Sequence, residues 1–319
     1  MSGSSPASSV PALEVKNLVK SYGPFPGVWD VSLTVERGTL HGFLGPNGSG
    51  KTTTMKCVIG LLRKTSGLIR VFGEEPRGDA TQMKKRVGYM PESPFFPKYL
   101  KGREVLLTYG RMRGTPPKKL DEESVSLLQR VGLADAAEKI TGKYSRGMLT
   151  RLGLAVALLG QPDLIILDEP TEGLDPVGVI QVRDILRGMV SEGRSVLLSS
   201  HQLPEVQQIC SRVTIVNQGR TVIEGSVANL ARRLHGGVVY KAEFDSVSPE
   251  LMSRLKRIDG VSEVEVIQDS VIRVVVSKDY DLRPFLARSA AEHGSLLLSC
   301  EREEASLEEL FLSLVRESD

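Results

Sequence analysis

A glycine-rich segment near residue 45 limits the possible folds of this chain more than any other part of the sequence. Its residues are Gly45, Pro46, Asn47, Gly48, Ser49, Gly50, Lys51 and Thr52, which match the pattern G-x-x-x-x-G-K-[ST]. A largely apolar run, 40–44, precedes the segment, and a helical pattern, 51–62, follows it. In such a unit the glycines let backbone N–H groups point at phosphate oxygens, and the helix N-terminus adds positive charge. The segment therefore predicts a phosphate-binding loop in an α/β domain.

Two acidic residues follow a second apolar run much further along the chain. Residues 164–167 are all aliphatic and lead into Asp168 and Glu169, while the run 195–199 leads into His201. Such runs are typical of parallel strands buried on both faces, whose carboxyl ends meet at one edge of a sheet. One carboxylate can then hold a metal ion while the other activates water. Taken singly, the acidic pair also fits a polar strand end, and His201 fits a capping or surface histidine.

A third feature lies between these two. Ser145 precedes a helical pattern at 146–159, and Gly147 falls in its first turn. Serine is a good N-cap, and a glycine in the first turn allows an anion to approach the backbone closely. The segment predicts a second phosphate-binding device.

The bulk composition excludes some classes of function. The chain has 319 residues, a quarter of them charged, and a net charge of +2, which disfavours nucleic acid despite local basic spots such as Lys118-Lys119. The longest apolar stretch near the motifs, 152–159, is far shorter than the roughly 20 residues of a membrane-spanning helix. The serine-rich start does not resemble a secretory signal. Three cysteines without metal-ligand spacing favour a reducing, cytosolic setting.

The regions around the motifs alternate between strand and helix patterns. Strands are expected at 13–19, 28–35, 68–72 and 86–90, with a closing hairpin at 213–216 and 221–224. Helices are expected at 101–113, 121–131, 146–159 and 176–192, so a helical insertion occupies about 93–160. We therefore expect a domain from 12 to 232 that begins as β structure, preceded by a disordered tail at 1–11.

A second, smaller domain is predicted for residues 238–319, after a break in the pattern at 232–237. Its expected elements are strands at 238–244, 261–267, 271–276 and 296–300 and helices at 249–256, 282–292 and 306–315. The first six follow the ferredoxin-like order β-α-β-β-α-β. A dimerisation or packing module is the simpler interpretation of this domain. A small-ligand regulatory site is the alternative, although no convergent polar cluster in the sequence supports it.

In this order and spacing the motifs resemble those of the nucleotide-binding subunit of an ABC transporter, over roughly residues 12–230. Residues 45–52 match Walker A, 164–169 match Walker B, 144–148 match the signature and 173–175 match the D-loop. His201 matches the switch histidine, and Tyr22 stands where the family has an aromatic residue that stacks on adenine. The resemblance implies a P-loop NTPase of ABC ATPase type, with a mixed sheet core, a helical subdomain and an N-terminal antiparallel β subdomain. The predicted α+β ferredoxin-like domain follows it.

The resemblance also implies roles for the Walker residues. Lys51 and Thr53 would bind the phosphates of ATP together with the rest of the glycine-rich loop. Thr52 and Asp168 would hold Mg²⁺, and Glu169 would activate the attacking water. Phosphoryl transfer of this kind depends on positioning and charge neutralisation more than on covalent chemistry.

The remaining motifs imply a site shared between two chains. His201 would contact the γ-phosphate and position the water. In this family the signature completes the ATP site of a partner subunit, so Ser145 and Gly147 would act on the opposite chain's ATP. Asp175 of the D-loop is a further nucleotide-binding candidate. Hydrolysis would then require a homodimer, or a pseudo-symmetric dimer with a second ATPase chain.

Three residues depart from the family's usual pattern. Glu92 stands where the Q-loop glutamine is usual, and a carboxylate there can still bind nucleotide-bound Mg²⁺ while adding a full negative charge. The signature has Arg146 and Met148 where glycine and glutamine are common. Glu172 replaces a small or amide residue before the D-loop glycine.

These departures, and the tail at 304–311, resemble the subclass that serves ABC type 2 exporters. The resemblance implies an ATPase subunit that works under a separately encoded, multi-spanning membrane permease, peripherally at the cytoplasmic face of the membrane. In the family the permease docks near the Q-loop, so contact is expected at 94–99. The alternative is an ABC-type ATPase outside transport, acting in cofactor assembly or on ribosomes.

Overall fold

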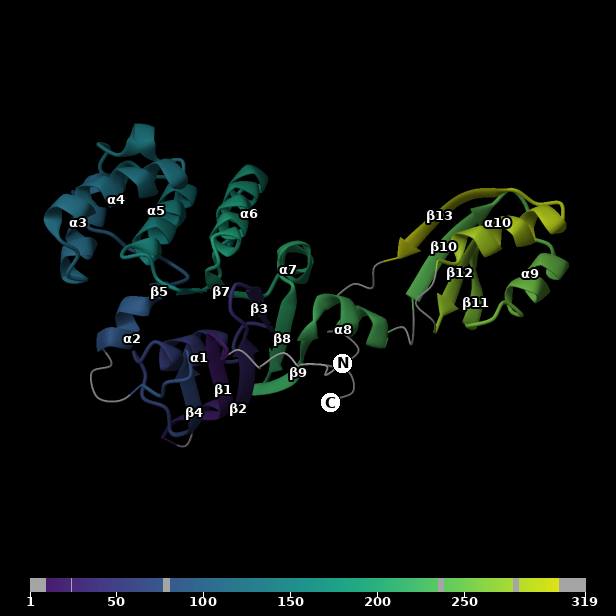
Figure 1. Cartoon of the computed structure of the whole chain (residues 1–319), viewed down its shortest axis with the longest axis horizontal. Helices are drawn as coiled ribbons and strands as arrows, with labels where there is room; N and C mark the ends of the chain where they lie inside the picture. The colour runs from purple at the N-terminus through teal and green to yellow at the C-terminus, as the bar shows by residue number, and fades with distance from the viewer. Residues whose placement is uncertain (1–9, 24, 77–80, 235–237, 278–280, 304–319) are drawn as a thin grey trace, which may run out of the picture. The chain divides into compact units, whose positions relative to one another are not determined.

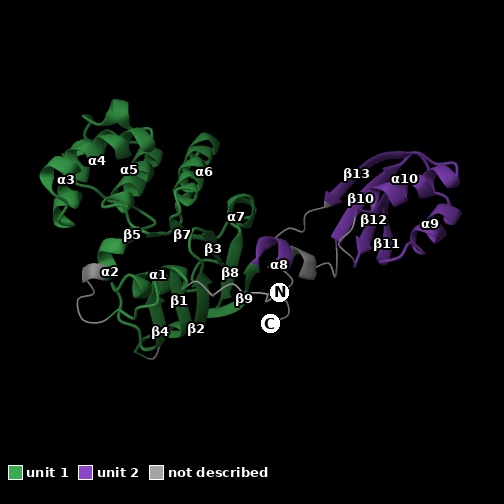
Figure 2. Ribbon diagram, viewed as in Figure 1, with its two compact units in different colours: residues 1–225 green, residues 226–319 purple. Residues whose placement is uncertain are grey.

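The computed structural model describes residues 10–23, 25–76, 81–234, 238–277 and 281–303. The chain divides into two compact units, 1–225 and 226–319 (Figure 2). Each unit has its own sheet and its own hydrophobic core. The domain limits predicted from the sequence, 232 and 238, lie close to this division and stay predictions.

Unit 1 is built on a nine-stranded mixed sheet with the order β4-β1-β2-β9-β8-β3-β7-β6-β5 (Figure 1). Its strands are β1 (Leu13–Tyr22), β2 (Phe25–Val35), β3 (Leu40–Leu44), β4 (Ser66–Val71), β5 (Val87–Met90), β6 (Leu164–Leu167), β7 (Ser195–Ser200), β8 (Arg212–Asn217) and β9 (Arg220–Ser226). The central strands β5, β6, β7, β3 and β8 are parallel. Every residue of β3, β6 and β7 is buried, as expected for parallel strands covered on both faces. Their carboxyl ends therefore lie side by side.

The predicted antiparallel β subdomain is confirmed by β1, β2 and β4. Strand β1 pairs with β2 on one side and with β4 on the other, both antiparallel. Leu13, Val15 and Leu18 of β1 are buried in the core, whereas neighbouring residues of the strand are partly or fully exposed. This alternation of buried and exposed residues is typical of a strand with one covered face.

The helices of unit 1 follow most of the predicted pattern. They are α1 (Lys51–Val58), α2 (Thr81–Arg86), α3 (Gly102–Met112), α4 (Pro117–Arg130), α5 (Arg146–Leu158), α6 (Pro176–Ser191) and α7 (Leu203–Ile209). Helices α3, α4 and α5 pack on one another and form the helical part of the unit (Figure 1). Helix α1 was predicted to reach residue 62 but ends at Val58, because the chain turns at Gly60 with a φ of 76°. Helices α2 and α7 were not predicted.

Unit 2 confirms the predicted ferredoxin-like order. After α8 (Val227–Leu234) it contains β10 (Val238–Phe244), α9 (Pro249–Leu255), β11 (Val261–Gln268), β12 (Val271–Val276), α10 (Arg283–Glu292) and β13 (Leu297–Glu303). The strands form an antiparallel sheet with the order β11-β12-β10-β13. Its core includes Tyr240, Phe244, Leu251 and Leu286. The helix predicted at 306–315 lies outside the described residues.

None of the helices in the described part of the chain combines the length and the hydrophobicity that a membrane crossing requires.

Candidate nucleotide-binding site

The glycine-rich loop connects the end of β3 to the start of α1. Gly48 and Gly50 have φ angles of 83° and 100°, which side chains with a Cβ rarely tolerate. A Cβ on Gly45 would collide with the carbonyl oxygen of Val216. These three positions therefore favour glycine, and the tight turn of the loop depends on them.

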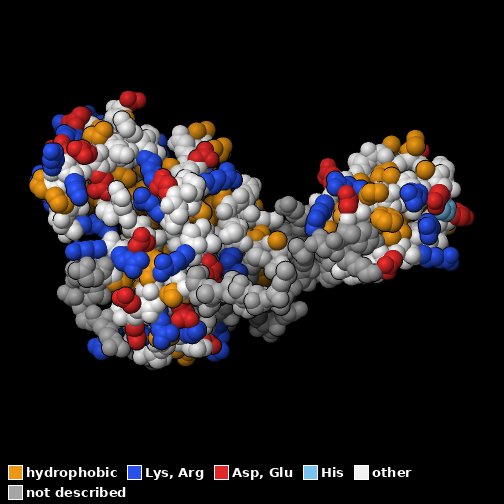
Figure 3. All heavy atoms as spheres, in the orientation of Figure 1, with side chains coloured by type: hydrophobic (Ala, Val, Ile, Leu, Met, Phe, Trp, Pro, Cys, Tyr) orange, Lys and Arg blue, Asp and Glu red, His pale blue; other side chains and the backbone are white. Residues whose placement is uncertain are grey.

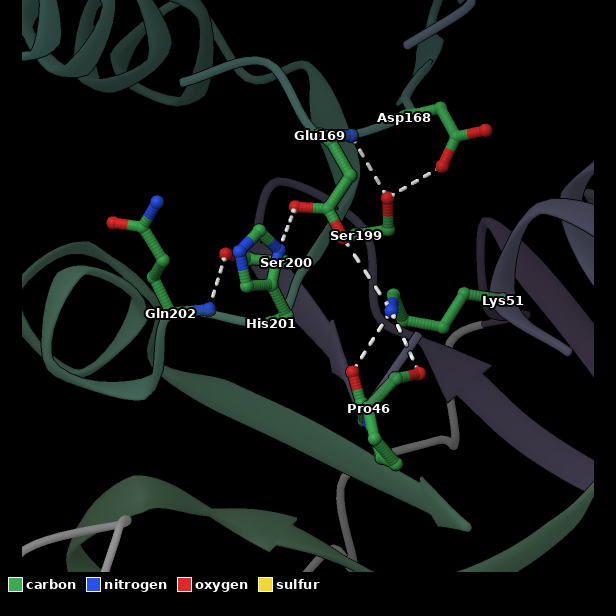
Figure 4. Close-up of polar contacts among 9 residues, drawn as sticks. Pro46, Lys51, Asp168, Glu169, Ser199, Ser200, His201 and Gln202 are labelled. Carbon is green, nitrogen blue, oxygen red and sulfur yellow. Dashed lines mark hydrogen bonds and ion pairs between the residues drawn. The ribbon is translucent and has the colours of Figure 1, made fainter. Parts of the chain in front are cut away.

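Lys51 begins α1, and its side chain is buried under the loop. Its Nζ donates hydrogen bonds to the carbonyl oxygens of Gly45, at 2.8 Å, and Pro46, at 3.3 Å. Nζ also lies 3.4 Å from Oε1 of Glu169 (Figure 4). Both side chains of this ion pair are less than a tenth exposed. The ammonium group therefore lies between the phosphate loop and the acidic strand end, as the motif pattern predicts.

Asp168 follows β6 and is almost completely buried. Its Oδ1 accepts a 2.7 Å hydrogen bond from the Ser199 hydroxyl, and the same hydroxyl accepts a 2.9 Å bond from the Glu169 N–H. The other oxygen, Oδ2, is buried and has no hydrogen-bond partner among the described residues. A buried carboxylate oxygen without a donor is costly unless a cation or another ligand satisfies it. Ser199 was not identified from the sequence, since a serine ending a strand carries no motif of its own.

Glu169 joins three parts of the site. Its φ of 48° is unusual for a residue other than glycine, and such backbone conformations cluster at functional sites. Its Oε2 lies 3.0 Å from Nδ1 of His201, and its Oε1 faces Lys51. Figure 4 shows Glu169, His201 and Lys51 pointing toward one another, while Asp168 points away from His201. The sequence prediction that the histidine and the acidic pair meet at one sheet edge is therefore correct in geometry.

A cavity of about 360 Å³ opens between the loop and the acidic strand end. It is lined by Gly27, Asn47, Gly48, Gly50, Lys51, Thr52, Thr53, Glu92, Glu169 and Glu172. The Glu92 pKa is raised, first by burial and then by the negative charges of Glu172, Asp168 and Glu169. The negative charges of Asp168, Glu169 and Glu172 thus act on Glu92 near Lys51. Glu92 lies where a metal or nucleotide ligand was predicted, and that role stays a prediction.

Tyr89 is a further residue that the motif patterns did not indicate. Its hydroxyl is buried, and no hydrogen-bond partner for it is found within the described residues. Burial, followed by the charges of Asp168 and Glu92, raises its pKa well above the ordinary value. The phenol is therefore a neutral potential donor next to the acidic cluster. The pairing of β5 with β6 brings the Tyr89 side chain near these acidic residues.

Tyr22, the predicted adenine contact, lies at the edge of this cavity. Its side chain is about half exposed, and its ring packs on Gly27, where a Cβ would come within 2.7 Å of the ring. Gly27 itself lines the cavity. The Lys20 Nζ lies 4.9 Å from the ring centroid. The ring is therefore placed where an aromatic base could stack, and the role stays a prediction.

The predicted signature and D-loop residues do not line the cavity. The Ser145 hydroxyl accepts a 3.2 Å bond from the Met148 N–H and caps α5, and Asp175 caps α6 through the Gly178 N–H at 2.9 Å. Ser145 is exposed and Gly147 is partly exposed. Their helix N-terminus is therefore available to an anion outside this chain's own cavity.

The signature and the D-loop of one chain touch each other. The Arg146 guanidinium lies against Gly173, whose φ of 66° already favours glycine, and a Cβ there would collide with it. Leu174 lies near Gly147, where a Cβ would make only an ordinary van der Waals contact with it, at 3.7 Å. The unusual arginine therefore packs on the D-loop backbone.

Comparison with known proteins agrees with the geometry of the site. The model of the ABC transporter family matches residues 28–172. The chain is 34% identical over 304 residues to the bacitracin transport ATP-binding protein BcrA of Bacillus licheniformis, covering 95% of this chain and 97% of that protein. It is 33% identical over 277 residues to the daunorubicin/doxorubicin resistance ATP-binding protein DrrA of Streptomyces peucetius, covering 87% and 80%. A solved structure of an ATP-binding subunit of an ABC transporter matches with a TM-score of 0.64 and 28% identity, covering 70% of this chain and 92% of that one.

The chain therefore belongs to the ABC transporter family, as one of its ATP-binding proteins. The resemblance inferred from the motifs and the fold expected from it are both confirmed. Proteins of this family bind ATP.

Proposed function

We propose that this chain hydrolyses ATP and that hydrolysis powers export of a substrate through a separately encoded, multi-spanning membrane permease. The observation that carries the ATPase part is the convergence of Lys51, Asp168, Glu169 and His201 beside one cavity. The printed names of BcrA and DrrA, which speak of transport and of drug resistance, support the export part. The chain would then act peripherally, at the cytoplasmic face of the membrane.

The cavity fits a nucleotide with a divalent cation. The backbone N–H groups of the loop and Lys51, together with Thr53, would hold the phosphates. Asp168 has a buried oxygen without a hydrogen-bond partner among the described residues, and Thr52 lines the cavity, so these two residues would hold Mg²⁺. Glu92 is a further candidate ligand for the ion. Bound Mg²⁺ would neutralise charge on the phosphate oxygens.

Glu169 is the best-placed general base. It is an acceptor in the cavity, held on one oxygen by His201, which fixes its direction. A base in this position can take a proton from a water molecule that lies within hydrogen-bond reach. His201, about a third exposed, can turn its other ring nitrogen toward a phosphate.

The second half of the site would come from another chain. Ser145, Gly147 and Asp175 lie outside the cavity of their own chain, and the first two form an exposed helix N-terminus. Facing a second copy, or a related ATPase chain, they would close over the partner's ATP. Closure of this kind excludes water and can be converted into motion.

An apolar cavity next to the Q-loop supports docking of a permease. It measures about 650 Å³, and among its lining residues are Tyr89, Pro91, Pro94, Phe95, Phe96 and Met112. The side chains of Phe95 and Met112 are about three-quarters exposed, as is Tyr99 nearby. Large exposed apolar side chains around a hollow mark an interaction surface. The predicted contact region at 94–99 lies in this place.

Two variants separate the chemistry from the docking. Glu169→Gln should retain ATP binding and lose nearly all turnover, because it removes the proton acceptor and keeps the shape. Phe95→Ser should keep the basal ATPase rate of the isolated chain and lose recovery of the permease, whereas Val125→Ser, an exposed apolar control on α4, should lose neither. Unchanged turnover in Glu169→Gln would remove Glu169 as the base.

The partner is then identified by capture. The Glu169→Gln protein, tagged and held with ATP, is purified from gently solubilised native membranes. A multi-spanning protein at one-to-one stoichiometry would support the exporter. Recovery only with ribosomes or a soluble assembly scaffold would contradict transport and leave the ATPase assignment intact.

A further inference from the structure

Unit 2 contains a cavity with both charged and apolar lining residues that the ATPase assignment does not use. It measures about 460 Å³ and is lined by Arg254, Arg257, Ile258, Asp259, Phe285, Arg288 and Ser289. The first four residues come from the last turn of α9 and the segment after it, and the others come from α10. Arg288 is far from Arg254 and Arg257 in the sequence, and the packing of α10 against α9 brings the three arginines to one cavity.

Two of the three arginines of this cavity differ from Arg283 of the same unit in their partners. Arg283, one turn earlier on α10, is bound by both oxygens of Asp281, each at 2.8 Å. Arg254 lies 3.9 Å from Glu292 in an exposed pair of little strength. For Arg257 and Arg288, no acidic partner is found among the residues that the structure describes. Two guanidinium groups thus line the cavity without an acidic partner among the described residues.

The wall of the cavity also offers an apolar surface. Phe285 is about half exposed, although it belongs to α10, whose other face is buried in the core. Ile258, which follows α9 in the chain, lines the cavity as well. On the surface of unit 2, Lys and Arg side chains lie among hydrophobic ones (Figure 3). An aromatic ring next to guanidinium groups suits a ligand with one planar or apolar part and one anionic part. Asp259 adds an acceptor at the rim and disfavours a ligand with a high negative charge.

We propose that this cavity is a binding site for a small organic anion that carries a phosphate or carboxylate group on an aromatic or apolar body. The planar forks of Arg257 and Arg288 would hold the anionic group, because guanidinium matches the geometry of both groups. Phe285 would pack on the body of the ligand. Unit 2 is then a ligand-binding accessory domain, and this site is separate from the ATP cavity, since all of its residues belong to unit 2.

The test uses the whole chain with its ATP cavity filled by MgADP, so that phosphate groups cannot bind there. Phenyl phosphate is titrated by calorimetry into the wild type and into three variants. Arg257→Ala and Arg288→Ala should each weaken binding about tenfold or more, as expected for loss of a charge-assisted contact. Arg283→Ala is the matched control, because its guanidinium is held by Asp281, and it should bind as the wild type does.

Two further arms identify the ligand class. Inorganic phosphate should bind more weakly than phenyl phosphate, and Phe285→Ala should reduce this difference while the melting temperature stays near that of the wild type. Vesicles of phosphatidylcholine with phosphatidylglycerol test whether the anion is instead a lipid headgroup. The proposal would be overturned if phenyl phosphate bound equally to the wild type and to the Arg257→Ala, Arg288→Ala and Arg283→Ala variants. It would also be overturned if phenyl phosphate did not bind at all, or if the protein bound only the vesicles.

Discussion

Ser199→Ala tests the hydrogen-bonding centre of the candidate nucleotide-binding site. The Ser199 hydroxyl donates to Oδ1 of Asp168 at 2.7 Å and accepts from the Glu169 N–H at 2.9 Å. Ser199 and Asp168 are almost completely buried, and Glu169 is nearly so. Water therefore cannot take the place of the missing oxygen. The variant leaves one carboxylate oxygen and one N–H group without their partner.

The expected loss follows from the type of each bond. A hydrogen bond between neutral groups contributes about 0.5–1.5 kcal/mol to stability, and one to a charged group about 1.5–3 kcal/mol. Their sum predicts that Ser199→Ala lowers the free energy of unfolding by about 2–4.5 kcal/mol. Ser200→Ala is the matched control on the same strand. Its hydroxyl accepts only one partly buried bond, from the Gln202 N–H at 2.9 Å, so its loss should be about 1 kcal/mol.

Urea unfolding measures both variants. The fluorescence of Trp29, the single tryptophan of the chain, reports on unit 1 because it lies in β2. The midpoint should fall while the slope with urea stays constant, since the same surface is exposed on unfolding. ATP turnover should fall as well, because both carboxylates lose the group that orients them. A loss in Ser199→Ala no larger than in Ser200→Ala would refute the reasoning.

The other predictions concern a core histidine and the D-loop. His41 is buried, its Nε2 lies 2.8 Å from Oγ1 of Thr214, and its pKa is lowered to about 3, first by burial and then by the charge of Arg212. The unfolded chain takes up a proton near pH 6.5 and the folded chain does not, so stability should fall as the pH drops from 6.5 toward 3, by about 2–3 kcal/mol at pH 4.5. In urea titrations from pH 7 to 4.5, His41→Gln should remove the part of the fall in the free energy of unfolding that His41 causes. If the free energy of the variant fell with pH as steeply as that of the wild type, the assignment to His41 would be contradicted. Gly173→Ala should lower the melting temperature, because of its φ of 66° and its contact with Arg146, and Arg146→Ala should restore part of the loss; equal losses with and without Arg146 would exclude that contact as the cause.

The parallel sheet was predictable because its strands carry a strong pattern. A strand buried on both faces needs only small and aliphatic side chains, and residues 164–167 meet this condition without exception. Helices α3, α4 and α5 were predictable from apolar residues at helical spacing. Helices α2 and α7 have six and seven residues, too few to establish a period. The phosphate loop was recognisable because the backbone conformation at Gly48 and Gly50 favours glycine whatever the distant contacts are.

The interior of the site was not predictable, since it depends on how strands are aligned. Leu167 of β6 pairs with Leu198 of β7, so the residues that follow, Asp168 and Ser199, fall next to each other. A shift of β7 by one residue would turn the Ser199 hydroxyl to the other face of the sheet. Nothing in the sequence pattern sets that register. The same reasoning applies to Tyr89, which reaches the acidic cluster only because β5 lies beside β6.

Under the proposed function, the contacts of Lys51 would link the binding of ATP to the action of Glu169. The Lys51 ammonium is shared between two loop carbonyls and Glu169, and Oε1 of Glu169 has no hydrogen bond among the described residues. A phosphate in the loop competes for this ammonium, because a phosphate oxygen carries more charge than a carbonyl. If Lys51 turned to the phosphate, Oε1 would lose its ion pair while His201 still held Oε2. The proposed base would then be directed into the cavity with one oxygen available to water, and only when the substrate is present.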